Sequence, residues 1–232
     1  MVKLLLFDAF LTLFNTEGTH LKATRLILES SGAQPCAPTL DPDEFHSQWD
    51  KFIVQEWRAE DGFKLLCDIF KDTLIKTFEY FGVKNNRADD VVKIWLDLIA
   101  DSPPYPEVEQ IVNPLTERYD TAIVSNADNY EMNLCLRRLT FTFPAVFTSE
   151  DVRVYKPRPE IFHAAMKHFG TAPHETLMIG DSLAADVEGA HNAGIRCVWI
   201  NRTGKILTPD HPQPDFILPD LNKLNKLLDS IQ

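Results

Sequence analysis

The feature that most constrains the fold is a short apolar run near the start of the chain, VKLLLF at residues 2–7, which ends directly at Asp8. A continuous run of this kind, without alternation, is typical of a strand in the middle of a parallel sheet, because such a strand is buried on both faces. Asp8 also interrupts the run before it reaches the length of a secretory apolar region. We therefore predict a central buried strand with a carboxylate at its carboxyl end.

Residues 17–101 carry patterns typical of helices. The series DPDE at 41–44 predicts a helix start, with its first Asp as the N-cap, Pro at the first helical position and Glu placed to complete a capping-box-like arrangement. Residues 63–81 have apolar side chains at helical spacing and run into Gly82, a common helix end. The spacing recurs over 89–99, so we expect a helical segment of about 85 residues.

The rhythm changes after the proline-rich stretch SPPYP at 102–106, which reads as a hinge. Strand and helix patterns then alternate, which predicts a parallel sheet covered on both faces. The strands are expected at 121–124, 145–148, 176–179, 197–200 and 216–218. The sequence thus predicts an α/β core that surrounds a helical insert in chain order, and the alternative is one irregular α/β domain.

Composition limits the possible partners. The formal net charge of −11 argues against a nucleic-acid backbone or an anionic membrane surface as a partner. No apolar stretch approaches the roughly 20 residues that span a bilayer. The four cysteines are widely spaced without a CxxC pair, so we expect reduced thiols, as in the cytoplasm, and neither a disulfide framework nor a cysteine metal site. They are Cys36, Cys67, Cys135 and Cys197.

Polar residues follow several of the predicted strands. Ligands of open parallel sheets bind at the carboxyl ends of the strands, so these side chains are expected at one edge. Taken singly, each is explained by a turn, a helix cap or a solvated surface position. Together, carboxylates, a lysine and small polar groups at one edge would form a site for an anionic substrate. The residues are Asp8, Ser125, Asn126, Lys156, Asp181 and Asp186.

Four segments of the chain resemble the motifs of the haloacid dehalogenase-like (HAD) hydrolase superfamily, in the family's order. They are FDAFLTLF, IVSNA, VYKPRPEIF and IGDSLAAD. The resemblance implies a Rossmann-like parallel-sheet core, residues 1–15 and 103–232, with an inserted helical cap domain, residues 16–102. It also implies a small-molecule substrate, and it leaves the oligomeric state open.

The resemblance further implies that Asp8 attacks the substrate to form a covalent aspartyl intermediate, which water then hydrolyses. Lys156 would offset the charge of Asp8. Ser125 and Asn126 would donate hydrogen bonds to substrate oxygens, so these three residues are expected to bind the substrate as well as to serve catalysis. Thr12 would orient the first loop.

A second carboxylate beside Asp8 would raise the pKa of one of the two acids unless a cation joins them. Two carboxylates with a backbone carbonyl and waters suit Mg²⁺. By resemblance, the ligands would be Asp8, the backbone carbonyl of Phe10 and Asp181. Asp186 would support the metal site from its edge, or would only cap the helix that follows.

Two of the motifs point to different branches of the family. Phosphatases have a second Asp, the general acid, where this chain has Phe10, and dehalogenases have an aromatic residue there. Asp181 instead matches the phosphatase pattern, and Leu11 stands where glycine is usual in both. We give Asp181 more weight, because a carboxylate facing Asp8 is costly without a metal, whereas general acid catalysis is worth about 10²–10⁴-fold and can be forgone with a good leaving group.

The sequence therefore predicts a Mg²⁺-dependent phosphatase that acts on a small phosphorylated metabolite with a good leaving group. One alternative is a metal-independent 2-haloacid dehalogenase, and another is a catalytically weak binding protein of the same fold. Specificity is expected to lie in the helical insert, although ordinary packing and solvation explain each candidate equally well. The candidates there are His46, Trp49, Lys51, Trp57 and Arg58. Arg153 is expected to be an exposed loop residue.

Overall fold

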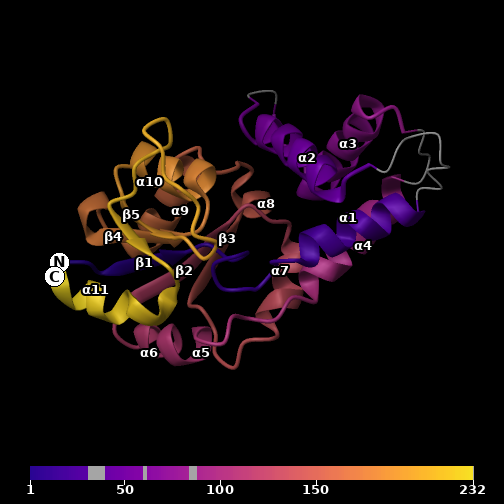
Figure 1. The fold of residues 1–232 in the computed structure, drawn as a ribbon. Helices are drawn as coiled ribbons and strands as arrows, with labels where there is room; N and C mark the ends of the chain where they lie inside the picture. The colour runs from indigo at the N-terminus through magenta and orange to yellow at the C-terminus, as the bar shows by residue number, and fades with distance from the viewer. Residues whose placement is uncertain (31–39, 60–61, 84–87, 232) are drawn as a thin grey trace.

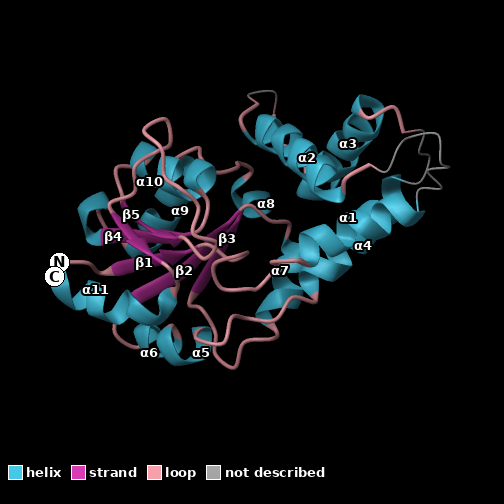
Figure 2. Ribbon diagram, viewed as in Figure 1, coloured by secondary structure: helices cyan, strands magenta, loops and turns pink. Residues whose placement is uncertain are grey.

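A computed structural model describes residues 1–30, 40–59, 62–83 and 88–231. Two parts are distinguishable, a sheet with helices on both faces and a separate group of helices that projects from it (Figures 1 and 2). The two ends of the described chain lie close together at the side of the sheet away from the projecting helices. Cys36 lies outside the described residues, while the other three cysteines are free thiols.

The described residues form a sheet of six parallel strands in the order β3-β2-β1-β4-β5-β6, so β1 lies in its interior. The strands are β1 (Leu4–Phe7), β2 (Asp120–Ser125), β3 (Ala145–Thr148), β4 (Thr176–Gly180), β5 (Arg196–Ile200) and β6 (Phe216–Leu218). Each predicted strand coincides with an observed one to within two residues. In the register, Phe7 lies between Ile123 and Ile179. The polar residues that follow β1, β2 and β4 therefore emerge at one edge.

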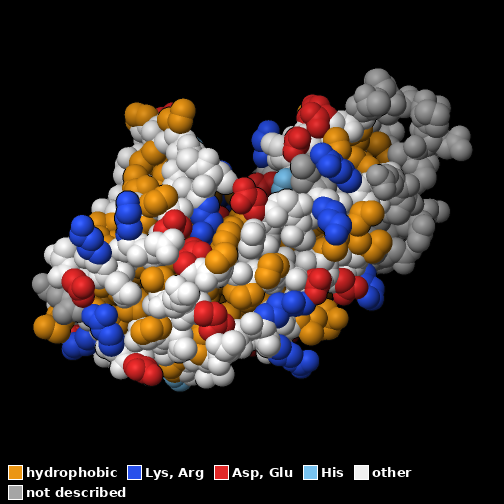
Figure 3. Space-filling view, turned by 60° about the horizontal axis from the view of Figure 1, so that its bottom comes forward, with side chains coloured by type: hydrophobic (Ala, Val, Ile, Leu, Met, Phe, Trp, Pro, Cys, Tyr) orange, Lys and Arg blue, Asp and Glu red, His pale blue; other side chains and the backbone are white. Residues whose placement is uncertain are grey.

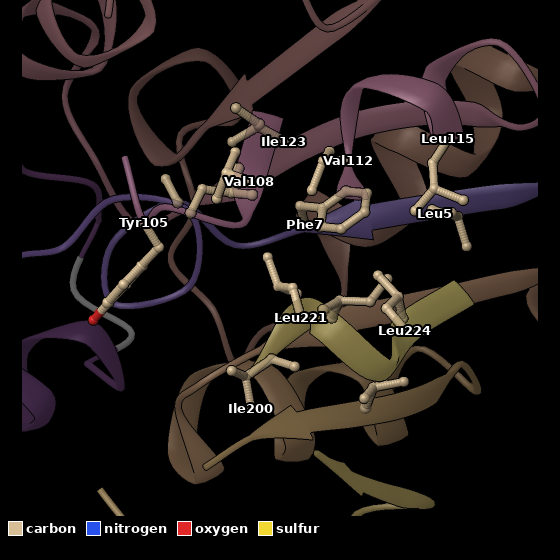
Figure 4. Close-up of a cluster of buried hydrophobic side chains, with 14 of the residues drawn as sticks. Leu5, Phe7, Tyr105, Val108, Val112, Leu115, Ile123, Ile200, Leu221 and Leu224 are labelled. Carbon is tan, nitrogen blue, oxygen red and sulfur yellow. The ribbon is translucent and has the colours of Figure 1, made fainter. Parts of the chain in front are cut away.

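The four residues of β1 are fully buried because they face two different hydrophobic clusters. Leu5 and Phe7 belong to the cluster on one face of the sheet, which Figure 4 shows in close-up with both side chains labelled. Leu4 and Leu6 belong to the cluster on the other face. Since successive side chains of a strand point to opposite faces, a strand covered on both sides must be apolar throughout.

Helices cover both faces of the sheet. The helices on the Leu5 face are α5 (Val108–Ile111), α6 (Asn113–Thr116), α7 (Asn129–Leu136) and α11 (Leu224–Ser230). The helices α9 (Glu160–Phe169) and α10 (Glu188–Asn192) cover the Leu4 face, and α8 (Ser149–Val152) follows β3. The α/β, Rossmann-like fold predicted from the sequence is confirmed.

Where the projecting part is described, it contains four helices, which share a third hydrophobic cluster. They are α1 (Thr19–Ser30), α2 (Pro42–Trp57), α3 (Leu66–Tyr80) and α4 (Ala88–Ala100). Helix α2 begins as expected, with the Asp41 side chain accepting the backbone N–H of Asp43 at 3.0 Å and Pro42 in first place. Helix α3 starts at Leu66, three residues later than the apolar spacing suggested. Gly82 adopts a positive φ of 67° after its end.

Two chain segments connect the parts and lie side by side. The N–H of Asn15 donates to the carbonyl of Pro103 at 2.8 Å, and the N–H of Tyr105 donates to the carbonyl of Leu13 at 2.8 Å. The proline-rich segment therefore pairs with the outgoing connection instead of standing free. We retain the division into 1–15 with 103–232 and 16–102 as a proposal. Among the described helices, none combines the length and apolar character that crossing a membrane requires.

Candidate active site

Lys156 is the central side chain at the carboxyl edge of the sheet. Only 1% of it is exposed, and its ammonium donates to Asp8 Oδ1 at 2.7 Å, to Asp186 Oδ1 at 2.6 Å and to the carbonyl of Val124 at 2.9 Å. These acceptors use all three N–H donors of the ammonium. Burial alone would lower the pKa of Lys156, but the carboxylates of Asp186 and Asp8 outweigh it and raise this pKa. Lys156 is therefore a fixed positive charge beside Asp8.

Asp186 is fully buried in the π-helical turn Leu183–Val187, which follows β4. Its Oδ2 accepts the backbone N–H of Ser182 at 2.9 Å, and its Oδ1 binds Lys156. The side chain packs so tightly on Gly180 that a Cβ at that glycine would lie 2.2 Å from Asp186 Oδ2. Asp186 thus supports Lys156 in addition to any role at the helix start, and the close approach explains why a glycine ends β4.

Asp181 completes a group of three carboxylates. One carboxylate oxygen from each of Asp8, Asp181 and Asp186 lies within 4.8 Å of the others. Burial raises the pKa of Asp181, and the neighbouring Asp8 and Asp186 raise it further. Burial likewise raises the pKa of Asp186 to about 6, although Lys156 opposes the shift. Three carboxylates therefore face one ammonium, and the excess negative charge suits a divalent cation with oxygen ligands.

Asp181 is contacted at its backbone and at its carboxylate. The indole Nε1 of Trp199, at the end of β5, donates to the carbonyl of Asp181 at 2.7 Å. The hydroxyl of Thr12 lies 3.5 Å from Asp181 Oδ1, at the outer limit of a hydrogen bond. Thr12 is fully buried, so the first loop and the loop after β4 contact each other directly.

Ser125, the last residue of β2, and Asn126, which follows it, contribute differently to the site. The Ser125 hydroxyl donates to Asp8 Oδ1 at 3.3 Å. The Asn126 side chain accepts the backbone N–H of Lys156 at 2.7 Å and donates to the Lys156 carbonyl at 3.1 Å. The amide of Asn126 therefore fixes the backbone of Lys156, a contact that the sequence did not predict.

Phe10 occupies the junction of the two parts. Its partly buried ring packs against both the cluster under the sheet and the cluster of the helical part. Tyr155, directly before Lys156, makes the same kind of contact: it is buried in the helical cluster, stacks on Phe63 and Trp57, and donates its hydroxyl to the carbonyl of Lys64 at 2.9 Å. An aromatic side chain packed between the two parts thus stands at the position where a phosphatase would have its general acid.

The residues considered for specificity fall into two groups. His46 and Trp49 belong to the interior of the helical part, where their rings contact Trp95. Lys51 is exposed on α2. Trp57 and Arg58 instead lie at the junction, where Arg58 forms a two-pronged ion pair with Glu188 at 2.9 and 2.7 Å. Arg153 is placed over the ring of Phe63 at 4.4 Å from its centroid.

The space-filling view shows a notch between the sheet-bearing part and the helical part, with acidic and basic side chains gathered around it (Figure 3). Two contacts between distant segments of the chain were not foreseen from the sequence, and the first of them crosses the junction. Asp128 accepts two backbone N–H groups at the start of α3. Arg202 donates to the backbone carbonyls of Leu11 and Thr12. Nothing in the local sequence pairs residues so far apart in the chain.

Comparisons with known proteins agree with this geometry. A family model described as haloacid dehalogenase-like hydrolase matches residues 52–200. The phosphoserine phosphatase of Thermus thermophilus is 32% identical over 161 residues, which cover 67% of this chain. The matched region spans 62% of the length of that relative, less than two thirds.

Solved structures share the fold over nearly the whole chain. The L-2-haloacid dehalogenase from Xanthobacter autotrophicus has a TM-score of 0.77 at 21% identity, with 100% of both chains covered. The HAD-hydrolase YfnB from Bacillus subtilis has a TM-score of 0.75 at 22% identity, with 98% of this chain and 99% of the other covered. With the family match over more than half of its length, the chain belongs to the haloacid dehalogenase-like hydrolases.

Proposed function

We propose that this hydrolase is a Mg²⁺-dependent phosphatase that acts on a small phosphorylated metabolite with a good leaving group. The observation that carries the proposal is the group of three carboxylates around one ammonium. A metal-independent enzyme needs no second acid facing its nucleophile, because an extra buried carboxylate weakens the ionisation of its neighbours. The phosphatase relative from Thermus thermophilus and the magnesium-bound YfnB support the same choice.

The donor set fits the metal. Asp8 and Asp181 supply carboxylate oxygens, the carbonyl of Phe10 would be a third ligand, and Asp186 would support the site from its edge. When bound, Mg²⁺ would neutralise charge on the phosphoryl oxygens and bring the phosphoryl group against Asp8. The buried Lys156 is already committed to Asp8 and Asp186, so it supplies one fixed positive charge and cannot by itself balance the three acids.

The chain's own residues define the remaining steps. A carboxylate oxygen of Asp8 attacks phosphorus, the bond from phosphorus to the leaving oxygen breaks, and an aspartyl phosphate forms. Ser125 and Lys156 both bind Asp8 Oδ1, which leaves Oδ2 as the oxygen free of these two contacts. Water then attacks phosphorus, and phosphate and the carboxylate are released. Asn126 keeps Lys156 in place by holding its backbone.

Phe10 defines the substrate class. Its ring cannot donate a proton to the departing oxygen, so the leaving group must depart as a stable anion or take its proton from water. Phenyl and acyl phosphates meet this requirement, whereas alkyl phosphates depend on an acid worth about 10²–10⁴-fold. We place the enzyme in the cytoplasm as part of the proposal, in keeping with its three described free thiols.

A second candidate is a 2-haloacid dehalogenase, favoured by the aromatic Phe10 and by the Xanthobacter autotrophicus fold. A panel of phenyl phosphate, acetyl phosphate, an alkyl phosphate and 2-chloropropionate, each with Mg²⁺ or EDTA, separates the two. Phosphate release that requires Mg²⁺ and is lost in Asp181→Asn supports the phosphatase. The exposed Asp68→Asn is the control. Halide release in EDTA would establish the dehalogenase instead, and no turnover of any substrate would favour a binding protein.

A further inference from the structure

Arg202 follows β5 by two residues and reaches the loop that carries the nucleophile. Its Nε donates to the carbonyl of Leu11 at 3.1 Å and its Nη2 donates to the carbonyl of Thr12 at 2.9 Å. Only 12% of the arginine side chain is exposed. The two carbonyls belong to consecutive residues directly after Phe10, so one planar guanidinium fixes the orientation of both peptide groups.

The same guanidinium also contacts the segment that returns from the helical part. Glu107, 11% exposed, approaches Arg202 Nη2 at 2.8 Å, and the guanidinium lies 3.4 Å from the centre of the Tyr105 ring. Tyr105 and Arg202 also line a pocket together with Leu11 and Asp181. Arg202 therefore joins three segments that meet at the carboxylate group.

The backbone conformation of Leu11 explains why the contact with Arg202 is needed. It has a φ of 60°, in the left-handed region that disfavours residues with a side chain such as leucine. This residue turns the chain back, so that the N–H of Leu11 donates to the carbonyl of Phe14 at 2.8 Å. Glycine would adopt the turn without steric conflict. With leucine there, hydrogen bonds to the surrounding peptide groups must hold the turn.

We propose that Arg202 is a positioning residue that holds the turn at Leu11, and thereby keeps Asp8 and the Phe10 carbonyl directed toward Asp181. The proposal rests on the proposed metal site and extends it. Arg202 acts through the backbone and touches no reacting atom. Groups that orient ligands in this way typically change metal affinity by about 10- to 100-fold when removed.

The test compares Arg202→Met and Arg202→Lys with wild type. Arg118→Met is a matched control, because Arg118 also lies over a tyrosine and pairs with an acid but is exposed and remote from the site. Binding of Mn²⁺ as a probe is measured by electron paramagnetic resonance on protein without substrate. We expect Arg202→Met to weaken it about 10- to 100-fold, Arg202→Lys to weaken it less, and Arg118→Met to leave it unchanged.

A double-mutant cycle with Leu11→Gly tests the mechanism. If Arg202 holds the strained turn, its removal must cost less metal affinity in the Leu11→Gly background, because glycine adopts the turn unaided. Equal losses in both backgrounds would overturn the proposal. So would a loss of stability in Arg202→Met without any change in Mn²⁺ affinity, since Arg202 would then have a structural role only.

Hydrogen exchange separates failure of this proposal from failure of the proposed function. In Arg202→Met, the amides of residues 11–14 must exchange faster than in wild type, with or without a metal. Unchanged exchange there refutes the positioning role whatever the metal does. Faster exchange in a protein whose wild type binds no Mn²⁺ would refute the metal site and retain the loop-holding role of Arg202.

Discussion

Replacing Asp128 by alanine removes a contact between the sheet and the helical part, and its cost follows from the structure. Asp128 is 5% exposed and follows Asn126 in the loop after β2. Its two carboxylate oxygens accept the backbone N–H groups of Leu66 at 2.7 Å and Cys67 at 2.9 Å, the first residues of α3. These N–H groups have no partner within their own helix, so a carboxylate there satisfies them and complements the positive end of the helix.

Hydrogen bonds to a charged group contribute about 1.5–3 kcal/mol each, and an N–H left buried without an acceptor adds a desolvation cost. Burial raises the pKa of Asp128, because the buried carboxylate loses its hydration. This loss of hydration offsets part of the stabilisation from the hydrogen bonds. We therefore expect Asp128→Ala to lower the free energy of unfolding by about 2–4 kcal/mol.

Urea denaturation at pH 7 measures this loss. Asp68→Ala is the matched control, because Asp68 lies in the first turn of the same helix but is exposed, and it should cost less than about 1 kcal/mol. The Michaelis constant should also rise in Asp128→Ala, since the loop that carries Ser125 and Asn126 loses its attachment to α3. A loss in Asp128→Ala no larger than in Asp68→Ala would refute the reasoning.

Three further changes have defined outcomes. Gly180→Ala would bring a Cβ to 2.2 Å from Asp186 Oδ2, so the carboxylate must move away from Lys156. Turnover should therefore fall by at least about tenfold in a steady-state assay, while circular dichroism should show that the fold persists. Burial raises the pKa of Glu131 from its ordinary 4.5 to about 7, so its contribution to the free energy of unfolding is lost as pH rises between these values. Glu131→Gln should lack this pH dependence. In denaturant titrations, its free energy of unfolding should therefore rise by about 3 kcal/mol relative to that of wild type between pH 4.5 and pH 8. A difference between the two proteins that does not change with pH would contradict the assignment. In a plot of rate against leaving-group pKa, the wild-type enzyme should have a steep slope. Phe10→Asp should accelerate the cleavage of poor leaving groups by at most about 10²–10⁴-fold. A flat wild-type plot would mean that another group supplies the proton or that leaving-group departure is not rate-limiting.

The sheet was predictable because its strands are separate apolar runs with a clear period. The run at 2–7 had to lie in the interior of the sheet, and the parallel order then brought Asp8, Ser125 and Asp181 to one edge. The proximity of the carboxylates therefore followed from sequence and topology together. The identity of the family depended on motif order, which no single residue conveyed.

Details within the site depended on tertiary contacts that sequence spacing does not encode. The side chain of Asn126 binds the backbone of Lys156, 30 residues away, although both residues were expected to face the substrate. Arg202 contacts carbonyls 191 and 190 residues earlier. The sequence position of Arg202 did not indicate this contact. Leu11 did indicate in retrospect that a contact was needed, because a leucine where glycine is usual implies a turn that other residues must support.

The most direct test of the central claim is to trap the covalent intermediate. Wild-type protein is mixed with phenyl phosphate, quenched in acid and digested, and the peptide that contains Asp8 is weighed by mass spectrometry. The account predicts one phosphoryl group on Asp8 when Mg²⁺ is present, and none in EDTA, in Asp8→Asn or in Asp181→Asn. Phosphate release at the full rate with EDTA, or a substrate-derived group on a peptide that lacks Asp8, would contradict it.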